Sequence, residues 1–130
     1  MFTAIVAVAC GGALGATARF LTVTFARFAF GGDYPIGTLM VNSLGSFLAG
    51  LIMILLLERF PVSDYWHLFL VVGFLGAFTT FSSYSWETWM LYQNKDIVFA
   101  ALNILCNNIF ALGLALSGII LGRWIGGTAL

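Results

Sequence analysis

The chain has 130 residues, of which 62% are hydrophobic and only 8% are charged, and five basic and five acidic residues give a net charge of zero at pH 7. A mean hydropathy of +1.05 excludes a soluble domain, because a fold of this size cannot hide so much apolar surface. The zero net charge provides no basic patch for nucleic acid. No nucleophile, metal-ligand set or cofactor motif indicates an enzyme.

Four apolar runs follow one another along the chain, and each is long enough to cross a hydrocarbon core of about 30 Å as a helix. They cover Ala4 to Phe28, Ile36 to Leu57, Trp66 to Tyr92 and Ile97 to Leu121. The connections between them are too short to be domains. The sequence therefore predicts an all-α membrane protein with four transmembrane helices, a single domain over residues 1–130, in the cell inner membrane.

Small residues four positions apart recur in three of these runs. Such spacing lets helix backbones approach closely in lipid, where no hydrophobic force draws helices together. The residues concerned are Gly11 and Gly15, Ser46 and Gly50, and Gly118, Gly122 and Gly126. Together they predict a tightly packed bundle.

The second run carries a polar stripe, because Thr38 and Asn42 are four residues apart and share a helical face. The fourth run carries another, Asn103 and Asn107, with Asn108 beside it. Amides are costly in lipid unless they meet a partner or water, so both stripes are expected to face inward. They either hold the helices together or line a path.

The third run contains the stretch "GAFTTFSSYSWE", Gly76 to Glu87, in which six of the seven residues from Thr79 to Ser85 carry hydroxyl groups. Poor helix formers, and side chains that compete for backbone hydrogen bonds, predict a break near Gly76 to Thr80. Non-helical backbone at membrane depth survives only where protein or water surrounds it, and freed carbonyls there can coordinate a cation. Alternatively, the hydroxyls only bond back to the preceding turn.

Phe81 and Tyr84 follow the predicted break and share a face. The electropositive edges of their rings, with amide and hydroxyl donors, suit an anion; otherwise the rings pack or face lipid. A proton-coupled exporter would instead need an intramembrane carboxylate. The only candidates are Glu58 and Glu87, and the first run has no acidic residue.

The loop charges are balanced. With four spans, Arg59 and Arg123 lie on one side of the membrane, while Arg27 and Lys95 lie on the other. Since positive loop charge sets orientation, this balance predicts insertion in both directions and makes an antiparallel homodimer available.

Two segments carry a family resemblance: "GTLMVNSLGS" in the second run and "GFLGAFTTFSSYSWE" in the third. They are similar to the paired signatures of the Fluc (CrcB-type) fluoride channels, and the resemblance covers the whole chain in length, spans and loop charge. It implies a dual-topology homodimer with two antiparallel fluoride pores, a third helix broken mid-membrane and a structural Na+ at the dimer centre. The implied function is passive, selective export of fluoride.

The resemblance also implies roles for individual residues. The backbone carbonyls of Gly76 and Thr79 from each subunit would hold the sodium. The fluoride pathway would include Phe81, Tyr84, Asn42, Thr38, Ser83, Glu87, Asn103 and Asn107.

Three of these positions differ from the residues usual in the family. Tyr84 departs from the family pattern, where Phe is usual, and Asn103 and Asn107 stand where Tyr and Ser are common. Arg19 matches a basic residue near the pore mouth; alternatively its side chain extends to the lipid headgroups.

Two rival interpretations remain at this point. A small dual-topology multidrug or cation exporter also has four short spans and balanced charge, but it would be expected to carry a Glu in its first helix. A purely structural membrane subunit would carry no ion at all.

Overall fold

The computed structural model describes residues 1–31, 34–56, 62–94 and 97–127, and these residues form helices joined by short connections. The elements are α1 (Phe2–Phe30), α2 (Ile36–Ile54), α3 (Asp64–His67), η2 (Leu68–Leu75), α4 (Gly76–Phe78), α5 (Phe81–Asn94) and α6 (Ile97–Gly126). The charged positions Glu58, Arg59 and Lys95 lie outside the described residues.

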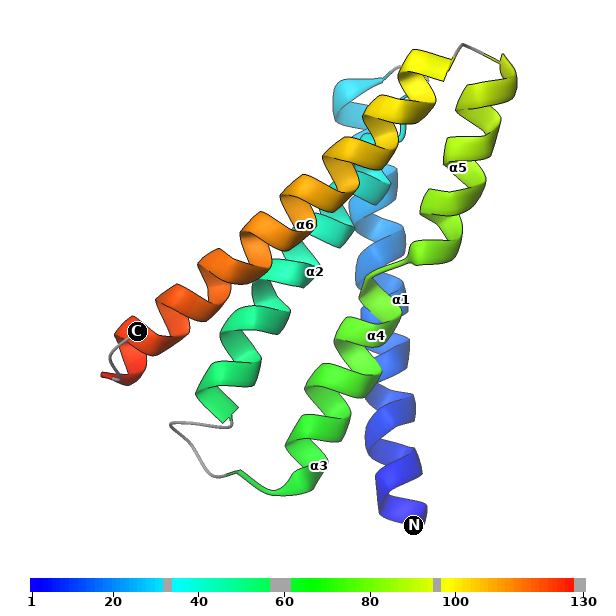
Figure 1. Ribbon diagram of the computed structural model, residues 1–130. Helices are drawn as coiled ribbons and strands as arrows, with labels where there is room; N and C mark the ends of the chain where they lie inside the picture. Colours follow the sequence, from blue (N-terminus) through cyan, green and yellow to red (C-terminus); the bar gives the residue numbers. More distant parts are fainter. Residues whose placement is uncertain (32–33, 57–61, 95–96, 128–130) are drawn as a thin grey trace.

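The prediction of four long apolar helices is confirmed. The segments long and apolar enough to cross a membrane are Phe2–Phe30, Ile36–Ile54, Asp64–Asn94 and Ile97–Gly126. The first, third and fourth helices extend beyond the predicted runs by two or more residues at one or both ends. The second helix ends at Ile54, before the predicted end at Leu57. The start of α1 and the end of α6 lie toward the same end of the molecule as α3 (Figure 1), as an even number of spans requires.

The third span consists of several helical pieces. It begins as α3, widens into the π-helical stretch η2, and returns to α-helix in α4. Thr79 then has an extended backbone (φ −81°, ψ 158°), and α5 starts at Phe81. Gly76, which the sequence placed at the start of the break, keeps helical dihedral angles; the non-helical residues are Thr79 and Thr80.

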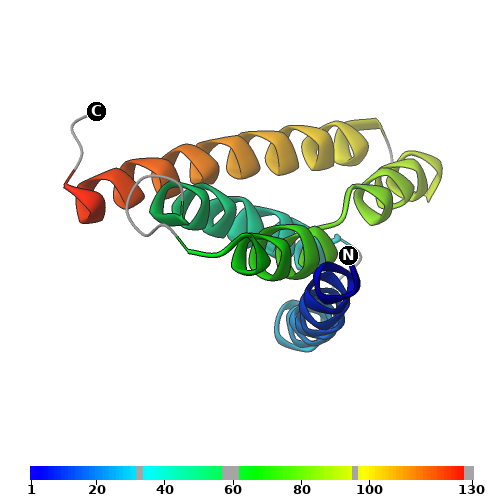
Figure 2. The same cartoon turned by 90° about the horizontal axis from the view of Figure 1, so that it is seen from below.

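Glycines bring α2 and α6 into close contact. A Cβ atom built on Gly50 would overlap the carbonyl oxygen of Ala115 in α6, and one on Gly118 would overlap the carbonyl oxygen of Phe47 in α2. Backbone therefore lies against backbone, which allows dispersion contacts without a hydrophobic driving force. The view in Figure 2 shows α2 lying between α6 and α1.

Glycines also join α1 to the third span. A Cβ on Gly11 would overlap the carbonyl of Phe69, one on Gly15 would overlap that of Phe74, and one on Gly73 would lie 2.7 Å from the carbonyl of Val8. The predicted role of the glycine spacing in helix packing is thus visible at both interfaces.

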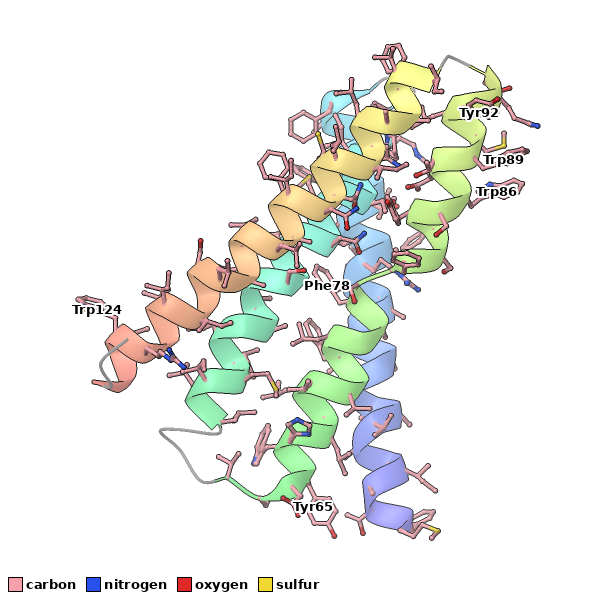
Figure 3. All side chains as sticks on the ribbon, viewed as in Figure 1. Tyr65, Phe78, Trp86, Trp89, Tyr92 and Trp124 are labelled. Carbon is pink, nitrogen blue, oxygen red and sulfur yellow. The ribbon has the colours of Figure 1, made fainter. Side chains whose placement is uncertain are left out.

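α5 is set aside from the line of α4 and packs mainly against α6 (Figure 1). Its aromatic side chains Trp86, Trp89 and Tyr92 point away from the bundle, whereas Tyr65 and Trp124 lie toward the other end (Figure 3). Trp and Tyr are typical of the two membrane–water interfaces. Phe78, next to the non-helical residues, lies between these two aromatic groups (Figure 3).

Candidate functional site

An open groove of about 420 Å³ lies beside the point where α4 gives way to α5. We call it the central groove. Residues of α2, the third span and α6 line it: Asn42, Gly45, Ser46, Ala49, Val71, Leu75, Gly76, Thr79, Thr80, Phe81, Tyr84, Asn107, Asn108 and Ala111. Six of the predicted site residues, from α2, the third span and α6, thus share one cavity: Asn42, Gly76, Thr79, Phe81, Tyr84 and Asn107.

The Asn42 side chain is bound to the backbone of the non-helical residues. Its Oδ1 accepts a hydrogen bond from the Thr80 N–H at 2.8 Å, and its Nδ2 donates to the Thr80 carbonyl oxygen at 3.1 Å. The Thr80 N–H, which in a continuous helix would bond to the Gly76 carbonyl, is therefore satisfied by a side chain of α2. No described backbone N–H outside the helices bonds to Gly76 in its place.

Thr80 also caps the N-terminal end of α5, which starts at the next residue. Its Oγ1 accepts from the Ser83 N–H at 3.2 Å, as an N-cap hydroxyl does, and donates to Ser83 Oγ at 3.1 Å. Thr79 and Ser85 instead donate back to the carbonyls of Leu75 and Phe81. The crowded hydroxyls thus divide: some bond to the preceding turn, and others start a new helix.

Arg19 of α1 reaches the same region. Its Nη1 lies 3.4 Å from the Thr79 carbonyl oxygen, at the long limit for a hydrogen bond. The guanidinium group of this residue, predicted near a pore mouth, lies in this chain beside one of the carbonyls expected to bind sodium.

A relay of hydrogen bonds runs from Asn42 into α6 and on to α5. Asn42 Nδ2 donates to Asn107 Oδ1 at 3.1 Å, and Asn107 Nδ2 donates to Asn103 Oδ1 at 3.0 Å and to its carbonyl at 3.1 Å. Asn103 Nδ2 donates to Thr88 Oγ1 at 2.9 Å, and Thr88 Oγ1 donates to the Tyr84 carbonyl at 2.8 Å. Asn103 is fully buried, with 0% exposure.

The direction of this relay is set at both ends by backbone groups. The Thr80 N–H can only donate, and the Tyr84 carbonyl can only accept. Turning any amide between them would place oxygen against oxygen or N–H against N–H. The two asparagine stripes of the sequence therefore meet, and their orientation is determined.

The two aromatic rings of the third span lie at the same groove. The ring centroids of Phe81 and Tyr84 are 5.2 Å apart at an interplanar angle of 64°, an edge-to-face arrangement. Phe81 is 77% exposed in the single chain, whereas Tyr84 is 8% exposed. The Tyr84 hydroxyl oxygen accepts a hydrogen bond from Asn108 Nδ2 at 3.3 Å.

A second cavity of about 230 Å³, which we call the end cavity, lies where α1 ends and α2 begins. It is lined by Val23, Ala26, Arg27, Gly31, Tyr34, Pro35, Ile36, Gly37, Thr38 and Glu87. Thr38 Oγ1 donates to Glu87 Oε1 at 2.7 Å, while Glu87 Oε2 is buried without a hydrogen-bond partner among the described residues. Burial, with Cys106 beside it, raises the pKa of Tyr34 to about 12, so this phenol stays protonated.

Ser83 lies between a residue of the central groove and a residue of the end cavity. It bonds to Thr80, which lines the central groove, and it precedes Glu87, which lines the end cavity, by one turn of α5. Thr38 and Glu87 thus meet at the end cavity, and Ser83 lies one turn before Glu87 on the side of the central groove.

Sequence reasoning missed three residues of this site. Thr80 was named only as part of the predicted break, and Asn108 only as a neighbour of the polar stripe, while Thr88 was not singled out. Thr88 directly follows Glu87 in the third span, so the sequence did show a hydroxyl group beside a predicted site residue. Its partner could not be seen, because Asn103 lies in another span.

Four helices in the described residues are long and apolar enough to cross a membrane, and the third is interrupted beside the central groove; together they define a multi-pass membrane protein. The model of the family described as CrcB-like protein, Camphor Resistance (CrcB), matches residues 6–119. The chain belongs to this CrcB family.

Several relatives in this family carry the name fluoride-specific ion channel FluC. The one from Legionella pneumophila (strain Lens) is 44% identical over 119 residues, which cover 92% of this chain and 89% of the relative. The one from Hydrogenovibrio crunogenus is 53% identical over 100 residues, 77% of this chain and 76% of the relative. The one from Thermococcus kodakarensis is 42% identical over 117 residues, which cover 90% of this chain and 94% of the relative.

Proposed function

We propose that this protein is a fluoride-specific ion channel that lets fluoride leave the cytoplasm passively across the cell inner membrane, and that it is not an enzyme. The observation that carries the proposal is its 44% identity, over 92% of its length, to a relative named a fluoride-specific ion channel. The geometry of the groove supplies a physical rationale.

The interruption between α4 and α5 turns two helix ends toward the central groove. The N-terminal end of a helix carries partial positive charge and favours an anion, while the C-terminal end favours a cation. Phe81 and Tyr84 lie in the first turn of α5, whereas Gly76 begins the three-residue α4 and Thr79 directly follows it. One interruption thus supports both the anion path and the cation site of the proposal.

The open groove, with amide groups and non-helical backbone in its lining, also supports a homodimer. Asn108 and Phe81 are exposed in the single chain, and polar groups and non-helical backbone are not stable against lipid. A second copy, inserted antiparallel, would cover the groove. The interruption would then lie mid-membrane, between the two aromatic groups of Figure 3. Arg27 and Arg123 lie near opposite ends of the bundle, as expected if positive charge is balanced between the two sides of the membrane.

The sodium ion of the proposal would be held by the Gly76 and Thr79 carbonyls of both copies. These neutral oxygens suit a monovalent cation, and the Gly76 carbonyl is released from helical bonding because Asn42 takes the Thr80 N–H. The long Arg19 contact to Thr79 is weak enough to be replaced. When bound, the cation would offset repulsion between the two subunits' dipoles.

The cation exporter is the weaker proposal. It needs a carboxylate that takes up and releases a proton at mid-depth. α1 has no acidic residue, and the central groove is lined by amides, hydroxyls and apolar side chains.

The test is fluoride efflux from liposomes loaded with KF and containing the purified protein. Adding valinomycin should release fluoride, while KCl-loaded liposomes keep their chloride. A well-folded protein that releases no fluoride would refute the proposal. Efflux of an organic cation driven by a pH gradient would indicate the exporter instead.

A further inference from the structure

The side-chain amide donors of the central groove are already engaged within the chain. Asn42 Nδ2 donates to Thr80 and Asn107, Asn107 Nδ2 donates twice to Asn103, and Asn108 Nδ2 donates to Ile104 and Tyr84. An amide nitrogen has two hydrogens, so each of these three groups is fully used. An anion in the groove would have to break one of these bonds or meet a different donor.

The Tyr84 hydroxyl is such a donor. Its oxygen accepts from Asn108 Nδ2 at 3.3 Å, and its own hydrogen makes no hydrogen bond to any described residue. The phenol lines the groove although the residue is 8% exposed, so its position is held by packing. Ser46 is the other groove-lining residue whose hydroxyl makes no hydrogen bond to the described part of the chain, but no neighbouring side chain orients it.

We propose that Tyr84 and Asn108 form an anion-binding pair in the central groove, in which Asn108 holds the phenol oxygen and Tyr84 donates its hydrogen to fluoride. This inference rests on the proposed function and deepens it. It assigns Asn108 a positioning role and makes the Tyr84 hydroxyl, beyond the ring edge, a determinant of fluoride affinity.

The pair gives the phenol two properties that a Phe ring lacks. A hydroxyl whose oxygen accepts a hydrogen bond becomes a stronger donor, because hydrogen bonds in a chain polarise one another. Fixing the oxygen by Asn108 also removes the alternative in which the phenol donates to Asn108 Oδ1. The small, strongly hydrated fluoride ion gains most from such a preorganised donor, and larger anions gain less.

The test compares Tyr84→Phe and Asn108→Leu with the wild type in liposomes, using the fluoride concentration that gives half-maximal efflux. Tyr84→Phe keeps the ring and removes only the hydroxyl; we expect its half-saturating concentration to rise about tenfold, as for loss of one hydrogen bond to a charged group. Asn108→Leu should raise it in the same direction, and the double variant should be no worse than Tyr84→Phe. Tyr92→Phe, on the outward face of α5 (Figure 3), is the matched control and should not change it.

A binding measurement separates this inference from the proposed function. In protein labelled with tyrosine at the ¹³Cζ position, the resonance missing from Tyr84→Phe should shift when NaF is added in detergent, and should not shift with NaCl. Absence of fluoride efflux from the wild-type protein would refute the proposed channel function. The NaF titration would still show whether fluoride binds at Tyr84. An unmoved Tyr84 resonance, or a half-saturating concentration unchanged in Tyr84→Phe, overturns the anion-binding pair.

Discussion

The side-chain amide of Asn42 binds both backbone groups of Thr80, accepting from its N–H at 2.8 Å and donating to its carbonyl at 3.1 Å. A residue of the second span thereby completes the hydrogen bonding of an interruption in the third. An interruption in lipid is stable only when its polar groups have partners. The Asn42–Thr80 contact therefore couples the packing of α2 to the shape of the groove.

Asn42→Leu should destabilise the protein and abolish fluoride efflux. The variant leaves the buried Thr80 N–H without a partner, at a cost of about 1–3 kcal/mol. Asn42→Asp keeps the acceptor for this N–H but places an oxygen against the Thr80 carbonyl, so intermediate stability is expected. Thermal unfolding in detergent, followed by size exclusion, measures both. Equal stability of Asn42→Leu and the wild type would show that the contact is dispensable.

Thr88→Val tests the far end of the hydrogen-bond relay. The change keeps the shape of the side chain but removes the oxygen that accepts from the fully buried Asn103. We expect a loss of about 1–3 kcal/mol in the free energy of unfolding, because an N–H group is left unsatisfied. Fluoride efflux should fall as well, since the relay loses its side-chain contact with α5.

Thr88→Ser is the matched control for that change. It retains the hydroxyl, so both the thermal midpoint and the rate of efflux should return toward wild-type values. Were Ser and Val to behave alike in both assays, Thr88 would act only by filling space.

Gly118→Ala should weaken the α2–α6 interface, because the added methyl group overlaps the Phe47 carbonyl. Gly113→Ala is the control, since a Cβ at that position meets nothing within 4 Å in the single chain. Replacing glycine by alanine inside a helix favours the helical conformation by about 1 kcal/mol. Gly113→Ala should therefore unfold no more easily than the wild type. A lower thermal midpoint only for Gly118→Ala would locate the effect in packing; no difference between the two would contradict it.

Phe81→Ile should reduce fluoride efflux to the rate of protein-free liposomes while the protein elutes from size exclusion as the wild type does. Isoleucine preserves apolar volume but has no electropositive ring edge to meet an anion. Efflux at the wild-type rate would mean that this ring only packs against Tyr84.

The sequence by itself was sufficient for the number of spans, because about 20 apolar residues in a row have no other stable environment than a membrane. The same holds for the place of the interruption, to within a few residues: "TTFSS" combines poor helix propensity with hydroxyls that compete for the backbone. Gly76 was included in the break because glycine lowers helix propensity. In the structure it stays helical, since the N–H lost to the helix is that of Thr80.

Which polar groups meet could be decided only by the tertiary structure. Asn42, Asn107, Asn103 and Thr88 come from three spans, and periodicity places each on a face without saying which face it meets. The same limit applies to Asn108, whose contact with Tyr84 depends on the displacement of α5 toward α6. Apolar length is a property of one segment and can be read along the chain. A directed hydrogen-bond relay is a property of several segments, and it exists only once their backbones are close enough for each donor to reach its acceptor.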